Sequence, residues 1–185
     1  MKRFGAVILL VLFLSGCSGA SGEMNRGLAL REKLQKGPCA FTTKVTADYG
    51  DKLYTFTLDC EGEEQGNLSF TVVEPESISE ITGRITGTGG ELTFEDTALS
   101  FPLMADGQVT PVSAPWLLLK TLRSGYLSSA GMDGEYLRLC MDDSYRDDAL
   151  HLDIWVNGDN LPVKAEILYS GRKILSLEVA SFTIS

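Results

Sequence analysis

Residues 150–184, which read LHLDIWVNGDNLPVKAEILYSGRKILSLEVASFTI, decide the fold. Apolar residues recur at every second position through much of this stretch, and Leu152, Ile154 and Val156 are one such series. An alternation of period two is typical of strands with one buried face. Asn157-Gly158 and Ser170-Gly171 interrupt the alternation with residues of tight turns. The stretch therefore predicts three consecutive antiparallel strands, 150–156, 161–169 and 173–184.

Two helical segments and further strands precede this stretch. Met24–Lys36 has apolar residues at helical spacing and ends at Gly37-Pro38, while Ala114–Ser129 begins beside Pro115 and ends before Gly131. Short alternating runs predict strands elsewhere, at 39–46, 54–59, 68–72, 81–88, 91–94, 98–101 and 135–141. Many short strands with two helices predict an α+β fold built on a curled antiparallel sheet.

The first two predicted strands form a hairpin with a definite register. Asp48-Tyr49-Gly50-Asp51 is a turn signal between them. A turn centred on Tyr49-Gly50 pairs Phe41 with Leu58 and places Cys39 opposite Cys60. Residues directly opposite are close enough for a bridge after a small adjustment. We therefore predict a Cys39–Cys60 disulfide with Cys140 as a free thiol. The alternatives are two buried thiols that never pair, or a Cys60–Cys140 bridge.

The N-terminus has the layout of a bacterial export signal. Lys2 and Arg3 precede an apolar stretch, Phe4–Leu14, of about 11 residues, which is too short for a comfortable membrane span. Leu14-Ser15-Gly16-Cys17 resembles the lipobox, in which the cysteine receives a diacylglycerol and becomes the new N-terminus. The alternative is an ordinary secretory signal with an incidental cysteine. A lipid on Cys17 would anchor the chain stably, because two or more acyl chains bind a membrane firmly whereas a single chain binds it only marginally.

This N-terminus sets the domain organisation and the localisation. We expect a signal peptide at 1–16, a lipidated and flexible tether at 17–23, and one domain at 24–185, outside the cytoplasm on a bacterial membrane. Removing the signal deletes two cationic residues and no acidic residue, so the net charge falls from −9 to −11. A chain this acidic is a poor binder of nucleic acid.

The sequence offers little catalytic chemistry. His151, the one histidine, shares its strand parity with Asp153 and Trp155 and not with the apolar face, so we expect it to be solvated or half-covered. No G-x-S-x-G elbow is present. Asp142, Asp143, Asp147 and Asp148 are interpreted as a solvated loop, with a calcium site as the alternative. The sequence contains no C-x-x-C pair, so it gives no indication of a zinc site. We therefore expect no enzyme, no cofactor and no metal.

The C-terminal third resembles a known family. LDIWV at 152–156, the turn at 157–158 and LPVKAEI at 161–167 are similar to the C-terminal pattern of the LolA/LolB lipoprotein-carrier superfamily, and ILSLEVASF at 174–182 continues the likeness. The resemblance implies an unclosed antiparallel half-barrel covered by helices, with acyl chains bound between sheet and helices. The superfamily includes a GerS-like branch, whose members bind and activate a cell-wall amidase.

Two functions of different class follow from these observations. The first is binding of a hydrophobic ligand, a lipid or lipoprotein acyl chain, in a half-barrel cavity. The second is a GerS-like protein-binding adaptor of the envelope or spore. A roomy apolar cavity favours the first, whereas a filled interior with an exposed strand edge or apolar patch favours the second. The predicted cavity lining is Phe56, Trp116, Leu118, Leu122, Ile154 and Ile167.

Overall fold

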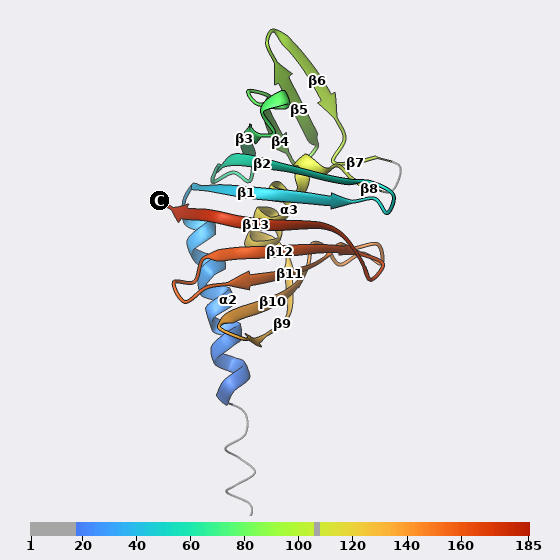
Figure 1. Ribbon diagram of the computed structural model, residues 1–185. Helices are drawn as coiled ribbons and strands as arrows, with labels where there is room; N and C mark the ends of the chain where they lie inside the picture. The colour runs from blue at the N-terminus through green and yellow to red at the C-terminus, as the bar shows by residue number, and fades with distance from the viewer. Residues whose placement is uncertain (1–17, 106–107) are drawn as a thin grey trace, which may run out of the picture.

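The computed structural model describes residues 18–105 and 108–185 (Figure 1). The predicted signal peptide and Cys17 lie outside the described residues. Within these residues the α-helices are α2 (Ser18–Lys36) and α3 (Ala114–Ser124), and the short 3₁₀ turns are η1 (Glu76–Ile78) and η2 (Pro111–Ser113). The strands are β1 (Cys39–Asp48), β2 (Leu53–Gly62), β3 (Leu68–Glu74), β4 (Thr82–Thr86), β5 (Gly89–Phe94), β6 (Thr97–Phe101), β7 (Met104–Ala105), β8 (Gln108–Val109), β9 (Tyr126–Asp133), β10 (Tyr136–Asp142), β11 (His151–Val156), β12 (Pro162–Tyr169) and β13 (Arg172–Ile184).

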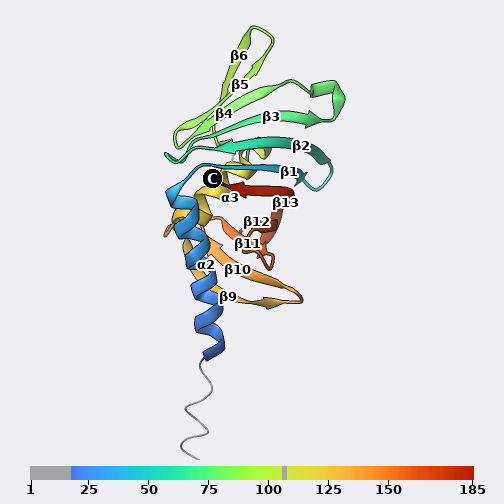
Figure 2. The ribbon, with the colours of Figure 1, turned by 90° about the vertical axis from the view of Figure 1, so that its left-hand side faces the viewer.

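Eleven strands form one antiparallel sheet whose two ends do not meet. The strand order is β6-β5-β4-β3-β2-β1-β13-β12-β11-β10-β9, so the last strand of the chain pairs with the first. Both helices lie on one side of the curved sheet, with α3 close to its middle (Figure 2). This is the predicted α+β architecture, an unclosed antiparallel half-barrel covered by helices.

Alternation along the strands separates a core face from an outer face. In β1 every odd-numbered residue from Cys39 to Ala47 is buried, whereas the even-numbered residues are exposed or half-buried. In β11 the residues Leu152, Ile154 and Val156 face the core, as the period-two pattern predicts. The helices bury this apolar face, because a sheet with one hydrophobic side must pack against another layer.

The predicted helices differ from the observed ones at one end each. Residues 18–23 belong to α2, so the predicted flexible tether is helical where the structure describes it. α3 ends at Ser124, and residues 126–129, predicted as helix, begin β9. Gly125 is extended, and pairing with β10 then holds the following residues as a strand. A neighbouring strand overrides weak local helix propensity here.

The β1–β2 register differs by two residues from the prediction. Phe41 lies opposite Cys60, and Cys39 lies opposite Gly62. The loop holds four residues, 49–52, and Asp48 accepts a hydrogen bond from the Gly50 backbone N–H at 2.8 Å. The turn therefore centres on Gly50-Asp51, one residue later than predicted. A shift of two keeps every side chain on its predicted face but changes its partner.

Among the described residues, none of the helices combines the length and the hydropathy that a membrane crossing needs.

Candidate functional site

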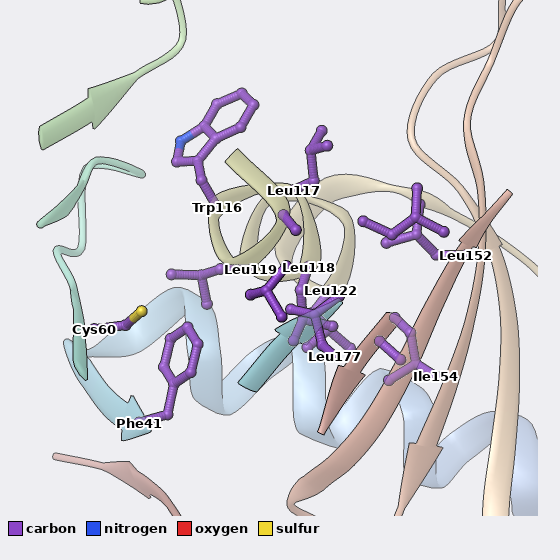
Figure 3. Close-up of a cluster of buried hydrophobic side chains, with 14 of the residues drawn as sticks. Phe41, Cys60, Trp116, Leu117, Leu118, Leu119, Leu122, Leu152, Ile154 and Leu177 are labelled. Atoms are coloured by element: carbon purple, nitrogen blue, oxygen red, sulfur yellow. The ribbon is translucent and has the colours of Figure 1, made fainter. Parts of the chain in front are cut away.

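The six residues predicted to line a cavity lie in or against one core. Trp116, Leu118 and Leu122 are on α3, with Ile154 on β11 and Ile167 on β12. These five are at most 6% exposed and belong to the main hydrophobic cluster, and Phe56 on β2 is half-buried and packs against it. Figure 3 shows α3 between Phe41 and Cys60 on one side and Leu152 and Ile154 on the other.

The interior around α3 is filled by side chains. None of the six residues lines any of the pockets described for the structure. Packing is close where α3 meets the first hairpin: a Cβ added at Gly62 would lie 2.4 Å from Leu119 Cδ2 and 2.8 Å from Cys39 Sγ. α3 therefore acts as a plug that completes the core, which is one of the two alternatives that the apolar α3 sequence left open.

Polar contacts hold α3 in this position. The Trp116 indole N–H donates to the Gly66 carbonyl at 2.8 Å, which ties the helix to the β2–β3 turn. Arg123 is buried and donates to the carbonyl oxygens of Leu34, Gly37 and Glu63. These contacts join α3 to the end of α2 and to the sheet. A helix fixed at both ends by buried hydrogen bonds is a part of the core and not a mobile cover.

A small apolar pocket opens at the end of the half-barrel, beside the β1–β2 and β12–β13 turns. Its volume is about 200 Å³, and its walls include Tyr49, Val109, Tyr169 and Ile174. Asp48 and Arg172, whose charged atoms are 4.0 Å apart, also line it. Burial raises the pKa of the Tyr49 hydroxyl. Ligand pockets commonly measure about 300–1,000 Å³, so this one suits a small apolar group better than whole acyl chains.

The β5–β6 hairpin presents an exposed, uncharged strand edge. β6 ends the sheet order, and its sequence TALSF holds neither a charge nor a proline. Leu99 in the middle of β6 is 64% exposed, and Phe94 before the turn is 51% exposed. The hairpin projects at the end of the molecule far from α2 (Figure 1). Natural edge strands are usually protected by charges, prolines or bulges, so an unprotected edge marks an interaction surface.

At the opposite end of the sheet, α2 packs on the inner face of β9 and β10, while β9 itself holds only exposed and half-buried residues. Gly27 of α2 lies so close to these strands that an added Cβ would meet Leu139 Cδ2 at 3.0 Å and Leu127 Cδ2 at 3.2 Å. The sequence analysis did not predict which strands form the two edges of the sheet. The uncharged run at 97–101 was a usable signal, but nothing local says which strand ends a sheet.

The three cysteines of the described chain are free thiols. The predicted Cys39–Cys60 disulfide is therefore absent from the structure. The β1–β2 register on which the prediction rested was wrong, because Cys39 lies opposite Gly62 and not opposite Cys60. Cys39 and Cys60 lie on the same inner face as diagonal neighbours. Burial raises the pKa of the Cys39 thiol and raises that of Cys60 well above its ordinary value. Neither thiol is therefore activated as a nucleophile.

The acidic segment after β10 is occupied by its own neighbours. Asp143 accepts from Lys120 and from the Leu150 backbone N–H, and Asp148 pairs with Arg146. Asp142 contacts the half-exposed His151. These carboxylates are spread among separate partners, so the calcium alternative gains no support.

The fold and this filled interior define an unclosed antiparallel half-barrel with a packed core. No protein-family model matches the chain, and no curated protein sequence matches it. Several solved structures are similar to the chain at low sequence identity. A LolA superfamily protein from Nitrosomonas europaea is 12% identical, with 86% of this chain and 93% of that chain covered and a TM-score of 0.45.

Two further solved structures are similar at low identity. A putative outer membrane lipoprotein-sorting protein domain from Vibrio parahaemolyticus is 8% identical, covering 86% of this chain and 91% of its own, with a TM-score of 0.49. An uncharacterized conserved protein from Thermus thermophilus is 12% identical, covering 88% of this chain and 87% of its own, with a TM-score of 0.49. Likeness at these identities concerns the fold, and neither binding nor activity follows from it.

Proposed function

We propose that this chain is a non-enzymatic, lipid-anchored binding protein of the bacterial envelope, and that it binds a segment of a partner protein at the free edge of β6. The proposal rests on the combination of two features, a filled interior and an exposed, uncharged edge strand. A filled interior leaves no room for acyl chains around α3. The exposed edge supplies unpaired backbone N–H and C=O groups, to which a strand of a partner protein can bind.

The binding mode that suits such an edge is strand addition. An extended peptide that lies beside β6 pairs its backbone with the outward N–H and C=O groups, and side-chain contacts add specificity. Leu99 is the exposed apolar anchor of this edge. Glu95 and Asp96 form the hairpin tip between β5 and β6. The expected partner segment therefore carries an apolar residue opposite Leu99 and a basic residue near the tip.

Site-specific photo-crosslinking tests this proposal in cells that make the full-length lipoprotein. A photoreactive amino acid at Ala98 should yield one defined adduct with an envelope protein, identified by mass spectrometry. Leu99→Asp should abolish the adduct, because a carboxylate replaces the apolar anchor. Leu53→Asp is the matched control, since Leu53 is 66% exposed but lies on β2 away from the edge.

Three outcomes would contradict the proposal. No adduct would leave the edge without a partner. An adduct that survives Leu99→Asp would place the contact elsewhere. An adduct with a second copy of the chain would make the edge a dimer interface.

The apolar pocket at the end of the half-barrel supports a second candidate, binding of a small hydrophobic group. Its volume of about 200 Å³ exceeds the roughly 150 Å³ of an engineered apolar cavity that binds benzene. Native mass spectrometry with a short-chain fatty acid and a long-chain one is the test. The short chain should bind, and Ile174→Trp, which fills the pocket, should prevent this. Val73→Trp on the exposed part of β3 is the control. If Ile174→Trp and Val73→Trp bind the short-chain fatty acid equally well, this pocket is not the binding site.

A further inference from the structure

The outer face of β10 and β11 gathers three donor groups of different chemistry. Cys140 on β10 lies directly opposite Asp153 on β11, and His151 is two residues from Asp153 on the same strand. Residues two apart in a strand share a face, so all three side chains point away from the core. One donor atom from each residue lies within 4.8 Å of the other two. The pairing of the strands, and not proximity in sequence, creates the cluster.

Asp153 provides an independent sign that the cluster is built to hold a ligand. Its side chain is only 8% exposed although it lies on the outer face. One carboxylate oxygen, Oδ2, accepts from Arg138 at 2.6 Å. The other, Oδ1, is buried without a nitrogen or oxygen donor and lies 3.5 Å from His151 Nε2, and the weakly donating Cys140 thiol is the remaining neighbour of this carboxylate. A buried carboxylate oxygen without a partner is costly, so its environment requires an explanation.

His151 is oriented toward the same point. Its Nδ1 lies 2.8 Å from Asp142 Oδ1, the residue directly opposite on β10. A carboxylate at Nδ1 favours a proton on that nitrogen and leaves the Nε2 lone pair free. Histidines that bind metals are commonly held in this way by a carboxylate behind them. The Asp142–His151 contact therefore presents Nε2 to Asp153 and Cys140.

We propose that Cys140, His151 and Asp153 form a binding site for a divalent transition-metal ion, with Zn²⁺ as the preferred ion. Zinc takes thiolate sulfur, imidazole nitrogen and carboxylate oxygen. At its usual bond lengths, two ligand atoms of a tetrahedral site are about 3.5 Å apart, which the Nε2–Oδ1 distance matches. The mixed donor set with a thiolate disfavours magnesium and calcium, which prefer oxygen ligands.

The surrounding charges and space fit this assignment. Asp142 and Asp153 are negative and Arg138 is positive, so the cluster has a net charge of −1 with the thiol protonated. Zinc binding expels the Cys140 proton to water and brings the net charge to zero. A surface hollow of about 350 Å³ has Ser129, Arg138 and Cys140 on its walls. Water in this hollow supplies the fourth ligand that a three-residue zinc site needs.

Metal titration of the full-length protein in detergent, with thiols reduced and prior metal removed, tests the proposal. We expect one Zn²⁺ per chain, measured against a chromogenic chelator. Co²⁺ should give a thiolate-to-cobalt charge-transfer band. Cys140→Ser and His151→Gln should each weaken zinc binding by more than about 100-fold. Asp142→Asn, which removes the partner behind His151, should weaken it by about 10–100-fold.

Two control variants separate the site from other thiols and acids. Cys39→Ala removes a buried thiol from the core, and Asp148→Asn removes an exposed carboxylate that pairs with Arg146. Both should bind zinc like the wild type. A wild-type stoichiometry near zero would overturn the proposal, as would a cobalt spectrum without the thiolate band. Unchanged binding by Cys140→Ser, with its metal-free melting temperature preserved, would also overturn it. These results are independent of the crosslinking at β6.

Discussion

Arg123 Nε on α3 donates a hydrogen bond of 2.8 Å to the carbonyl oxygen of Leu34 near the end of α2, across 89 residues of sequence. The same guanidinium reaches the carbonyls of Gly37 and Glu63. A cation near a helix C-terminus also interacts favourably with the helix dipole. One buried side chain therefore joins both helices and the sheet, and it fixes α3 as the plug of the half-barrel.

Replacing Arg123 with methionine should destabilise the fold strongly. Methionine keeps much of the volume but leaves three carbonyl groups without their donor. Each hydrogen bond to a charged group contributes about 1.5–3 kcal/mol, so we expect a loss of at least about 3 kcal/mol. Urea unfolding followed by circular dichroism measures it. Arg146→Met, at an exposed ion pair, should change stability by less than about 1 kcal/mol. Equal effects of the two variants would contradict the role of Arg123.

Gly62→Ala should destabilise through overpacking. The added Cβ would lie within 3 Å of Leu119 and Cys39, which fill the contact between α3 and the first hairpin. Forcing a methyl group into a packed core costs about 1–3 kcal/mol. Gly158→Ala is the matched control, because an added Cβ there has nothing within 4 Å. Thermal unfolding of both variants checks this, and a neutral Gly62→Ala would mean that the interior has spare room.

Cys17→Ser should leave an uncleaved precursor without lipid. The motivation is the Leu14-Ser15-Gly16-Cys17 sequence, since only the cysteine thiol can accept the diacylglycerol. Radiolabelled palmitate should enter the wild-type chain and not the variant. Incorporation into Cys17→Ser at the wild-type level would refute the lipid anchor.

Cys39 and Cys60 should resist alkylation in the folded protein. Both are buried, and burial raises the pKa of each thiol, which lowers the fraction of reactive thiolate. In the metal-free protein, Cys140 is half-buried on the outer face and should react first. Alkylation without reductant, before and after unfolding, followed by peptide mapping, gives the order. Recovery of a Cys39–Cys60 disulfide peptide would instead restore the bridge that the sequence predicted.

Glu166 should contribute stability that disappears in acid. Burial alone would raise the pKa of its carboxyl, but hydrogen bonds from Lys164 and Lys173 outweigh this and lower the pKa. A lowered folded-state pKa favours the native state above the ordinary glutamate pKa of about 4.3, and the benefit is lost as pH falls through the folded value. Glu166→Gln should therefore cost up to about 1 kcal/mol at pH 7 and almost nothing near pH 2. A difference independent of pH would contradict this.

The sequence alone determined most of the strands, though not β9, together with the core of each described helix and the faces of the strands. Local alternation and turn residues contain this information, because burial of one face imposes a period of two on each strand. The C-terminal strands that Asn157-Gly158 and Ser170-Gly171 delimit were predicted within one residue of their observed ends. The parity of the first hairpin was also correct, so Cys39 and Cys60 were placed on the inner face.

Only the tertiary structure decided which strands pair and which side chains meet. The observed register of β1 and β2 has a four-residue loop, 49–52, which the turn residues alone do not specify. Whether α3 covers a cavity or fills the core depends on the packing of side chains from several strands, since both arrangements need the same apolar sequence. The cluster of Cys140, His151 and Asp153 was missed for the same reason: Cys140 and His151 are separate in sequence, and strand pairing brings Cys140 opposite Asp153.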